Sequence, residues 1–338
     1  MPKSRLRPLA PALLVAVVTA SCGGAPSTSS QPSTSSSAAT TVAPSTGTLQ
    51  IAVAPFRLPA PVSREVLLTD GHQLVALGGL DASKNSTPTV TTIDPASGRT
   101  RPLGPLSFPV HDSAGVYVGG RYLVIGGGDG TPPQRSTVQA VSPTGGASQA
   151  VGNVAVPRAD HVAALVGTTI YALGGGEEAT HLYTSVEASS SNGSTWRAAG
   201  SLAMPVRYPA VAVVNGAVYL FGGVTTAQGM DTTAIQRYDP ATQTTQVIGQ
   251  LPAPLSHATA AILGGSVYLF GGFVNNVISP QVLRVELPAG TVTPAGTLPT
   301  PLSDAAAVVI GGTGYLVGGQ GSTSVPVDTI LTLTLAKP

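Results

Sequence analysis

The sequence predicts an all-β fold, a propeller of six four-stranded antiparallel blades, on three observations. A diglycine follows a short apolar run six times at nearly constant spacing. A proline precedes each diglycine by a constant offset. The strong patterns are short apolar runs bounded by Gly, Pro or Asn, which are typical of strands, and helical periodicity is absent.

Two markers that run in phase define the repeat. The diglycines are separated by steps of 48, 48, 48, 49 and 47 residues, and they begin at Gly78, Gly126, Gly174, Gly222, Gly271 and Gly318. The marker prolines lie 17 residues before each of these glycines, at Pro61, Pro109, Pro157, Pro205, Pro254 and Pro301. A period near 50 residues with strand-like content indicates a propeller or a similar array.

Each unit predicts its strands in the same order. Small apolar residues follow the proline, as in 162–166, and then comes a tight turn such as Asn215-Gly216. A second apolar run such as 219–221 leads into the diglycine, where a side chain would collide with a neighbouring backbone. We expect the third strand to alternate, as in 235–238, and a short fourth strand to close the unit near Trp196 or Val247.

The two ends of the repeat region complement each other. After Gly319 the chain has room for only one more strand, at 329–335, so the sixth unit lacks its fourth strand. A strand-like run at 49–53 precedes the first marker proline. Placing this run in the last blade closes the ring and removes an exposed edge.

These units resemble kelch repeats. The resemblance rests on the diglycine, on a tyrosine three residues before it (Tyr171, Tyr219, Tyr268 and Tyr315), and on the phrase Tyr238-Asp239-Pro240. It covers residues 49–338 and implies a kelch-type six-bladed propeller. The sequence departs from the pattern in the fourth strands, where only Trp196 keeps the tryptophan that kelch units often carry.

The first 48 residues predict export and a tether. Lys3, Arg5 and Arg7 precede an apolar stretch that is too short to span a bilayer, so residues 1–21 are expected to be a signal peptide. The run Ala20-Ser21-Cys22 resembles the lipobox of bacterial lipoproteins, which implies lipid attachment at Cys22; the alternative is a plain secretory signal. Residues 22–48 then form a disordered linker rich in Ser, Thr and Pro.

Composition excludes some partners. The formal net charge is +1 and only 9% of residues are charged, so we expect no binding to nucleic acid. Contact with the membrane is expected only through the lipid anchor, and the protein is expected to be monomeric. The single cysteine excludes a disulfide framework within the chain.

The candidate site lies at the start of the innermost strands, near the mouth of the central channel. The position three residues after each marker proline is polar or charged in every unit. With two neighbours, the candidates are Arg64, Asp112, Asp160, His161, Arg207, Tyr208, His257 and Asp304. One interpretation is a ring of ligand-binding groups; the other is that these groups only satisfy strand ends and channel water.

Specific chemistries find less support in the residues. Kelch-like galactose oxidases hold copper beside a tyrosine linked to a cysteine, and here Cys22 lies outside the propeller. The histidines His111, His161 and His257 lack local metal-ligand spacing, so neither a metal nor another cofactor is expected.

Two families of carbohydrate-active enzymes remain as comparisons. Sialidases clamp a carboxylate with three arginines and use a tyrosine, for which Arg64, Arg158, Arg207 and Tyr208 are candidates, and the segment 189–196 resembles a degenerate Asp-box with Ser191 in place of aspartate. A kelch-type sugar mutarotase or epimerase is the better alternative, with Asp112, Asp160 or His161 as acid and base.

No complete catalytic set can be assembled from the sequence. The sequence therefore favours a cell-surface module that binds a glycan, a peptide or an envelope protein, over an enzyme.

Overall fold

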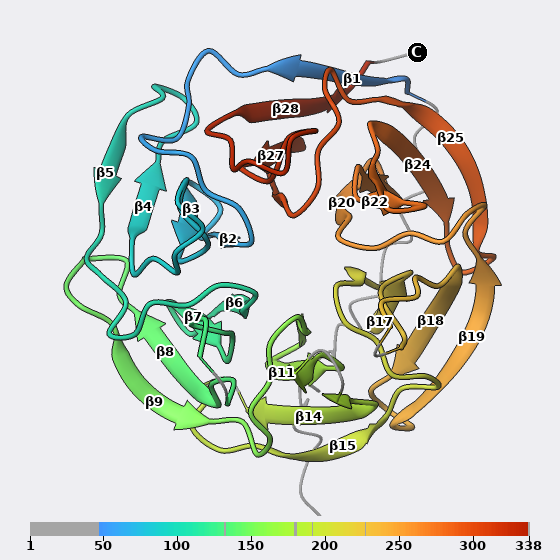
Figure 1. Ribbon diagram of the computed structural model, residues 1–338, viewed down its shortest axis with the longest axis horizontal. Helices are drawn as coiled ribbons and strands as arrows, with labels where there is room; N and C mark the ends of the chain where they lie inside the picture. The colour runs from blue at the N-terminus through green and yellow to red at the C-terminus, as the bar shows by residue number, and fades with distance from the viewer. Residues whose placement is uncertain (1–46, 132, 179–180, 191, 227, 337–338) are drawn as a thin grey trace, which may run out of the picture. The chain divides into compact units, whose positions relative to one another are not determined.

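The structure is a computed structural model that describes residues 47–131, 133–178, 181–190, 192–226 and 228–336. The signal peptide, Cys22 and nearly all of the linker expected at 22–48 lie outside these residues. The described residues contain no helix and form six four-stranded antiparallel sheets arranged as a ring (Figure 1), which confirms the predicted fold class. None of their segments is a helix able to cross a membrane.

The blades follow one another along the chain, and each is given from its innermost strand outward. Blade 1 contains β2 (Val66–Thr69), β3 (Leu74–Leu77), β4 (Val90–Ile93) and β5 (Thr100–Pro102). Blade 2 contains β6 (Ala114–Val118), β7 (Arg121–Ile125), β8 (Thr137–Val141) and β9 (Gln149–Asn153). Blade 3 contains β10 (Val162–Val166), β11 (Thr169–Leu173), β14 (Ser185–Ser190) and β15 (Arg197–Ser201).

The second half of the ring has the same plan. Blade 4 contains β16 (Ala210–Val214), β17 (Ala217–Phe221), β18 (Ala234–Asp239) and β19 (Thr244–Gln250). Blade 5 contains β20 (Thr259–Leu263), β21 (Ser266–Phe270), β24 (Gln281–Glu286) and β25 (Thr291–Thr297). Blade 6 contains β26 (Ala306–Ile310), β27 (Thr313–Val317), β28 (Ile330–Leu335) and β1 (Leu49–Val53).

The ring closes as the sequence predicts. Strand β1 pairs with β28 in antiparallel register, from Leu49 opposite Leu335 to Val53 opposite Leu331. In Figure 1 the blue β1 lies along the red β28 on the outside of the same blade. Since this pairing joins the two ends of the propeller, blade 6 is complete only when the N-terminal strand is in place.

The core consists of layers between neighbouring blades. One layer joins Leu173 of blade 3 to Val218 of blade 4, and another joins Phe270 of blade 5 to Leu316 of blade 6. The third strands alternate only in part: in β18, Gln236 is 1% exposed beside the fully buried Ile235, whereas Arg237 and Asp239 are half-buried on either side of the buried Tyr238. Blades stack on both faces of this strand, so a polar residue such as Gln236 is enclosed as well.

The diglycines are where each blade meets the next. A Cβ on Gly78 would lie 2.6 Å from the carbonyl oxygen of Val110, and Gly79 donates its N–H to the same oxygen at 2.8 Å. The corresponding N–H donates across every junction, to the carbonyls of Val62, Val110, Arg158, Val206, Leu255 and Leu302. Glycine is required here because a side chain would collide with this carbonyl.

Two small hairpins that the sequence did not predict project after the diglycines. Strands β12 (Gly176–Glu178) and β13 (His181–Leu182) pair in blade 3, and β22 (Phe273–Val274) and β23 (Val277–Ile278) pair in blade 5.

Candidate functional site

Six residues, one from each blade, form a closed circle at the start of the innermost strands. We call this circle the mouth ring: Arg64, Asp112, Asp160, Tyr208, His257 and Asp304. Each residue donates its backbone N–H to the carbonyl of the ring residue in the preceding blade, at 2.8–3.2 Å. Each also has a left-handed backbone, with φ between 53° and 60°. That conformation costs an ordinary residue roughly 1–2 kcal/mol, so the surrounding structure holds all six in place.

The left-handed turn follows from the pairing just before it. The residue that precedes each ring residue forms an isolated bridge with the residue after the diglycine, as Ser63 does with Leu80 and Ser256 with Phe273. The innermost strand continues the same register after the ring residue, as Val66 opposite Leu77 continues Ser63 opposite Leu80. The ring residue therefore lies in a short interruption of one antiparallel pairing, where its left-handed backbone leaves its side chain lining the cavity.

The mouth ring surrounds an open cavity of about 160 Å³. Seven of the eight residues proposed from the sequence line it: Arg64, Asp112, Asp160, His161, Tyr208, His257 and Asp304. The eighth, Arg207, does not line the cavity but approaches Asp160, with Nη1 3.5 Å from Oδ2. The wall continues into the central channel, where a second space of about 380 Å³ is lined by the innermost strands.

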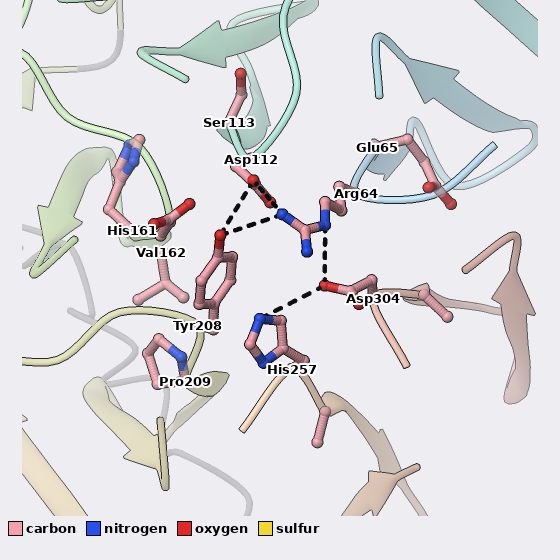
Figure 2. Close-up of a pocket in the computed structure, with 13 residues that line it drawn as sticks. Arg64, Glu65, Asp112, Ser113, His161, Val162, Tyr208, Pro209, His257 and Asp304 are labelled. Carbon is pink, nitrogen blue, oxygen red and sulfur yellow. Dashed lines mark hydrogen bonds and ion pairs between the residues drawn. The ribbon is translucent and has the colours of Figure 1, made fainter. Parts of the chain in front are cut away.

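Arg64 occupies the centre of the mouth (Figure 2). Its Nη1 donates to Asp112 Oδ2 at 2.9 Å and to the Tyr208 hydroxyl at 3.2 Å, and its Nε lies 3.4 Å from Asp304 Oδ1. Burial lowers the pKa of Arg64, but Asp112 and Asp304 outweigh it and hold the pKa above the ordinary value. The guanidinium is therefore a permanent cation, and its side chain remains 24% exposed to the cavity.

Tyr208 contacts ring residues on both sides of the cavity. Its hydroxyl donates to Asp112 Oδ2 at 3.3 Å, and its ring stacks on His257 with centroids 3.8 Å apart. The guanidinium carbons of Arg64 and Arg207 lie 5.4 and 5.3 Å from the Tyr208 ring centroid. The result is an aromatic platform flanked by two cations.

The titratable groups of the mouth are shifted mainly by burial. Burial, with the nearby charge of Asp112, raises the pKa of Asp160 well above its usual range. Burial raises the pKa of Asp304 as well, although Arg64 opposes the shift. Burial and the charge of Arg64 lower the pKa of His257 to about 3, so this imidazole is neutral at physiological pH.

Two residues beside the ring point elsewhere. The His161 ring turns away from the Arg64 cluster (Figure 2), is buried, and has no hydrogen-bond partner for either nitrogen. Arg158 is fully buried at the junction of blades 2 and 3, where it pairs with Glu187 and donates to the carbonyl of Gly174 at 3.0 Å. The three arginines of a sialidase-type clamp therefore do not meet in the mouth, and Ser191 of the Asp-box-like segment lies outside the described residues.

Glu65 is a cavity residue that the sequence reasoning missed. It follows Arg64 directly, lines the cavity, and has a buried carboxyl group that no described residue hydrogen-bonds. Burial, with a contribution from Asp304, raises its pKa well above the usual range. Its position beside a ring residue was the available signal. Within the described ranges, no three His, Cys, Asp or Glu side chains are grouped so as to hold a metal ion.

Comparisons with known proteins add the fold but no activity. No protein-family model matches the sequence, and no curated protein matches it. The solved structure of YjhT is similar to this chain, with a TM-score of 0.73 and 14% identity over 84% of this chain and 97% of YjhT. At that identity the similarity establishes a shared fold alone; the chain is a six-bladed propeller, similar in fold to YjhT.

Proposed function

We propose that this protein is a lipid-anchored, kelch-type propeller that binds one sugar residue of a glycan at its mouth. The observation that carries the proposal is the Arg64 network. An arginine that keeps a quarter of its side chain exposed lies between Asp112, Asp304 and Tyr208 at the centre of an open cavity. Donors and acceptors alternate there, as recognition of hydroxyl groups requires.

Size and charge favour a sugar over the other partners considered. The cavity of about 160 Å³ is below the ~300–1,000 Å³ typical of drug-sized ligands, so it accepts one small group rather than a long peptide segment. Two guanidinium groups face three aspartates, and the raised pKa of Asp160 favours its neutral form. A neutral ligand with several hydroxyls fits this near balance of charge, and the Tyr208–His257 platform supplies an apolar surface for a sugar ring.

A sugar mutarotase is the second candidate. Asp160 supports it, because a carboxyl with a raised pKa beside a tyrosine hydroxyl is suited to proton transfer at neutral pH. A freshly dissolved pure anomer would equilibrate faster with the protein than without it, and Asp160→Asn would remove that acceleration. If no monosaccharide anomer equilibrates faster, the binding function alone stands.

The binding proposal is tested by titrating the full chain with a panel of methyl glycosides, followed by calorimetry. We expect Arg64→Ala to weaken binding by about 1–3 kcal/mol, or roughly 5–150-fold, because hydrogen bonds to a charged group are lost. Lys84→Ala, on an exposed loop, is the matched control and should bind normally. A glycoside whose affinity survives substitution of all six ring residues would contradict the proposal.

The anchor is tested separately. Cys22→Ser should move the protein from the membrane fraction into the medium or leave an unprocessed precursor. A variant that is normally processed and stays in the membrane fraction would show that the lipid is not attached at this cysteine.

A further inference from the structure

The wall of the mouth has a polar half and an apolar half. The residue after each ring residue lines both the cavity and the channel in all six blades. In blades 1 to 3 these residues are Glu65, Ser113 and His161; in blades 4 to 6 they are Pro209, Ala258 and Ala305. The aromatic members of the mouth ring, Tyr208 and His257, also belong to blades 4 and 5 (Figure 2).

The apolar half continues outward through blade 5. The Phe273 ring meets the edge of His257, with centroids 5.1 Å apart. Phe273 begins the hairpin of β22 and β23, in which Val274 pairs with Val277. The Val277 side chain is 66% exposed at the hairpin tip. The ring contact of His257 with Phe273 and the strand pairing of the hairpin thus connect the cavity to an exposed apolar residue on the rim.

Blades 4 and 6 carry exposed apolar residues at the corresponding loops. Met230 follows the diglycine of blade 4 and is 64% exposed; Val325 follows that of blade 6 and is 49% exposed. The described part of the chain exposes six large apolar side chains in total, and three of them are these rim residues. Clustering of exposed apolar residues around a site is a sign of contact with a ligand or partner.

The rim of blades 1 to 3 is different. Its loops present the exposed Lys84, the ion pair of Asp129 with Arg135, and Glu177 within 3.9 Å of His181. One side of the rim therefore carries charged side chains, and the other side carries one exposed apolar residue in each loop among uncharged polar neighbours such as Gln228 and Asn276.

We infer that the ligand is amphiphilic: a sugar residue linked to an apolar aglycone, with the aglycone on the side of the mouth whose rim loops carry Met230, Val277 and Val325. This inference rests on the proposed function, because it places the sugar in the mouth. Arg64, Asp112 and Asp160 of the mouth ring, in blades 1 to 3, take the hydroxyl groups, and the aglycone leaves the cavity past His257 and Phe273 on the side of blades 4 to 6. Transfer of its methylene groups from water to this surface adds affinity.

The test compares methyl and hexyl β-glycosides of the same sugars, titrated into the full chain. We expect the hexyl glycoside to bind about tenfold more tightly, because several methylene groups are removed from water. The triple variant Met230→Ser, Val277→Ser, Val325→Ser should lose this gain and keep the affinity for the methyl glycoside. The matched control on the other side, Lys84→Ser, Thr131→Ala, His181→Ser, should keep both affinities, since these positions are also exposed rim residues.

The outcomes separate the two proposals. If methyl glycosides bind and depend on Arg64 but hexyl glycosides gain nothing, or gain equally in the triple variant, the amphiphilic ligand is overturned and the sugar site stands. If no glycoside binding depends on Arg64, the proposed function fails. If the wild-type chain associates with itself and the triple variant does not, the rim contacts a second copy and the inference is overturned.

Discussion

Two arginines, Arg64 and Arg158, are set in this propeller in opposite ways. Arg64 lies in the mouth, where it is partly exposed and shared among Asp112, Asp304 and Tyr208. Arg158 lies between blades 2 and 3 with no exposed surface. There it pairs with Glu187 and donates to Ser185 Oγ at 2.9 Å and to backbone carbonyls of the same region.

The contrast distinguishes an arginine that is able to bind a ligand from one that stabilises the fold. The donors of Arg158 are directed at enclosed protein acceptors, so no ligand can reach them and their removal would affect only folding. Arg64 lines an open cavity, and 24% of its side chain remains exposed there. A guanidinium that is partly exposed to open space is able to bind a ligand. The side chain's surroundings, more than its type, decide between the two roles.

The largest expected effect comes from breaking the buried pair. Glu187→Ala leaves the Arg158 cation buried without its partner, which should lower the free energy of unfolding by about 3–5 kcal/mol. Urea denaturation measures the loss. The double variant Arg158→Met, Glu187→Leu removes both charges and should recover most of it. A single variant within 1 kcal/mol of wild type would show that the pair is not enclosed in solution.

Acid should weaken the same junction through His161. Burial, and the charge of Arg158, hold the pKa of His161 well below its ordinary value. The folded protein therefore binds fewer protons than the unfolded chain below pH 6.5, and stability is lost as the pH falls. One such histidine costs about 2 kcal/mol between pH 7 and pH 5. Chemical denaturation at both pH values should show a smaller loss in His161→Gln, and an equal loss would exclude this histidine as a cause.

Removing Arg64 should cost less, and the cost should depend on pH in the opposite sense. Arg64→Ala leaves Asp112 and Asp304 buried without their cation, at a cost of about 1–2 kcal/mol at pH 7. Without Arg64 the pKa of Asp304, already raised by burial, rises further. A carboxyl group whose pKa is raised in the folded state stabilises the fold at low pH, and this stabilisation is lost as the pH rises. The difference in unfolding free energy between Arg64→Ala and wild type should therefore shrink at pH 5. A deficit that grows in acid would contradict the network.

The smallest effect tests the backbone of the mouth ring. Arg64 has φ of 58°, where glycine is free of the strain that alanine carries. Arg64→Gly should therefore be more stable than Arg64→Ala by about 1 kcal/mol, although both lack the side chain. In most folded segments the alanine variant is the more stable of the two, so the expected order here is the reverse. Thermal melts of the two variants decide it, and an alanine variant of equal or higher stability would exclude the left-handed turn.

The sequence predicted the fold well because the signals of a repeat are local. The diglycines and the residues of β1 mark turns and strands, and the constant period fixes how many blades must close. Side-chain direction near the mouth was not predictable in this way. Arg158, Asp160 and His161 are close neighbours in the chain, but Asp160 lines the mouth beside Arg207, Arg158 is fully buried, and the His161 ring turns away from the Arg64 cluster (Figure 2).

Two polar residues of the third strands are buried. Gln139 accepts the N–H of Phe108 at 2.9 Å, and Gln236 accepts that of Met204 at 3.1 Å, so both fix the loop just before a marker proline. An alternating pattern of polar and apolar residues normally indicates one face in water. Here the partner groups belong to another segment of the ring, and only the folded structure brings them together.

The circle of backbone hydrogen bonds through the mouth ring fixes the width of the channel opening. Six identical links join six residues, so the width of the opening is set by the number of blades and by peptide geometry. The side chains play no part in these links. The side chain at each of the six positions can therefore be replaced while the width of the opening stays the same. The same scaffold can present binding sites of different chemistry but equal size.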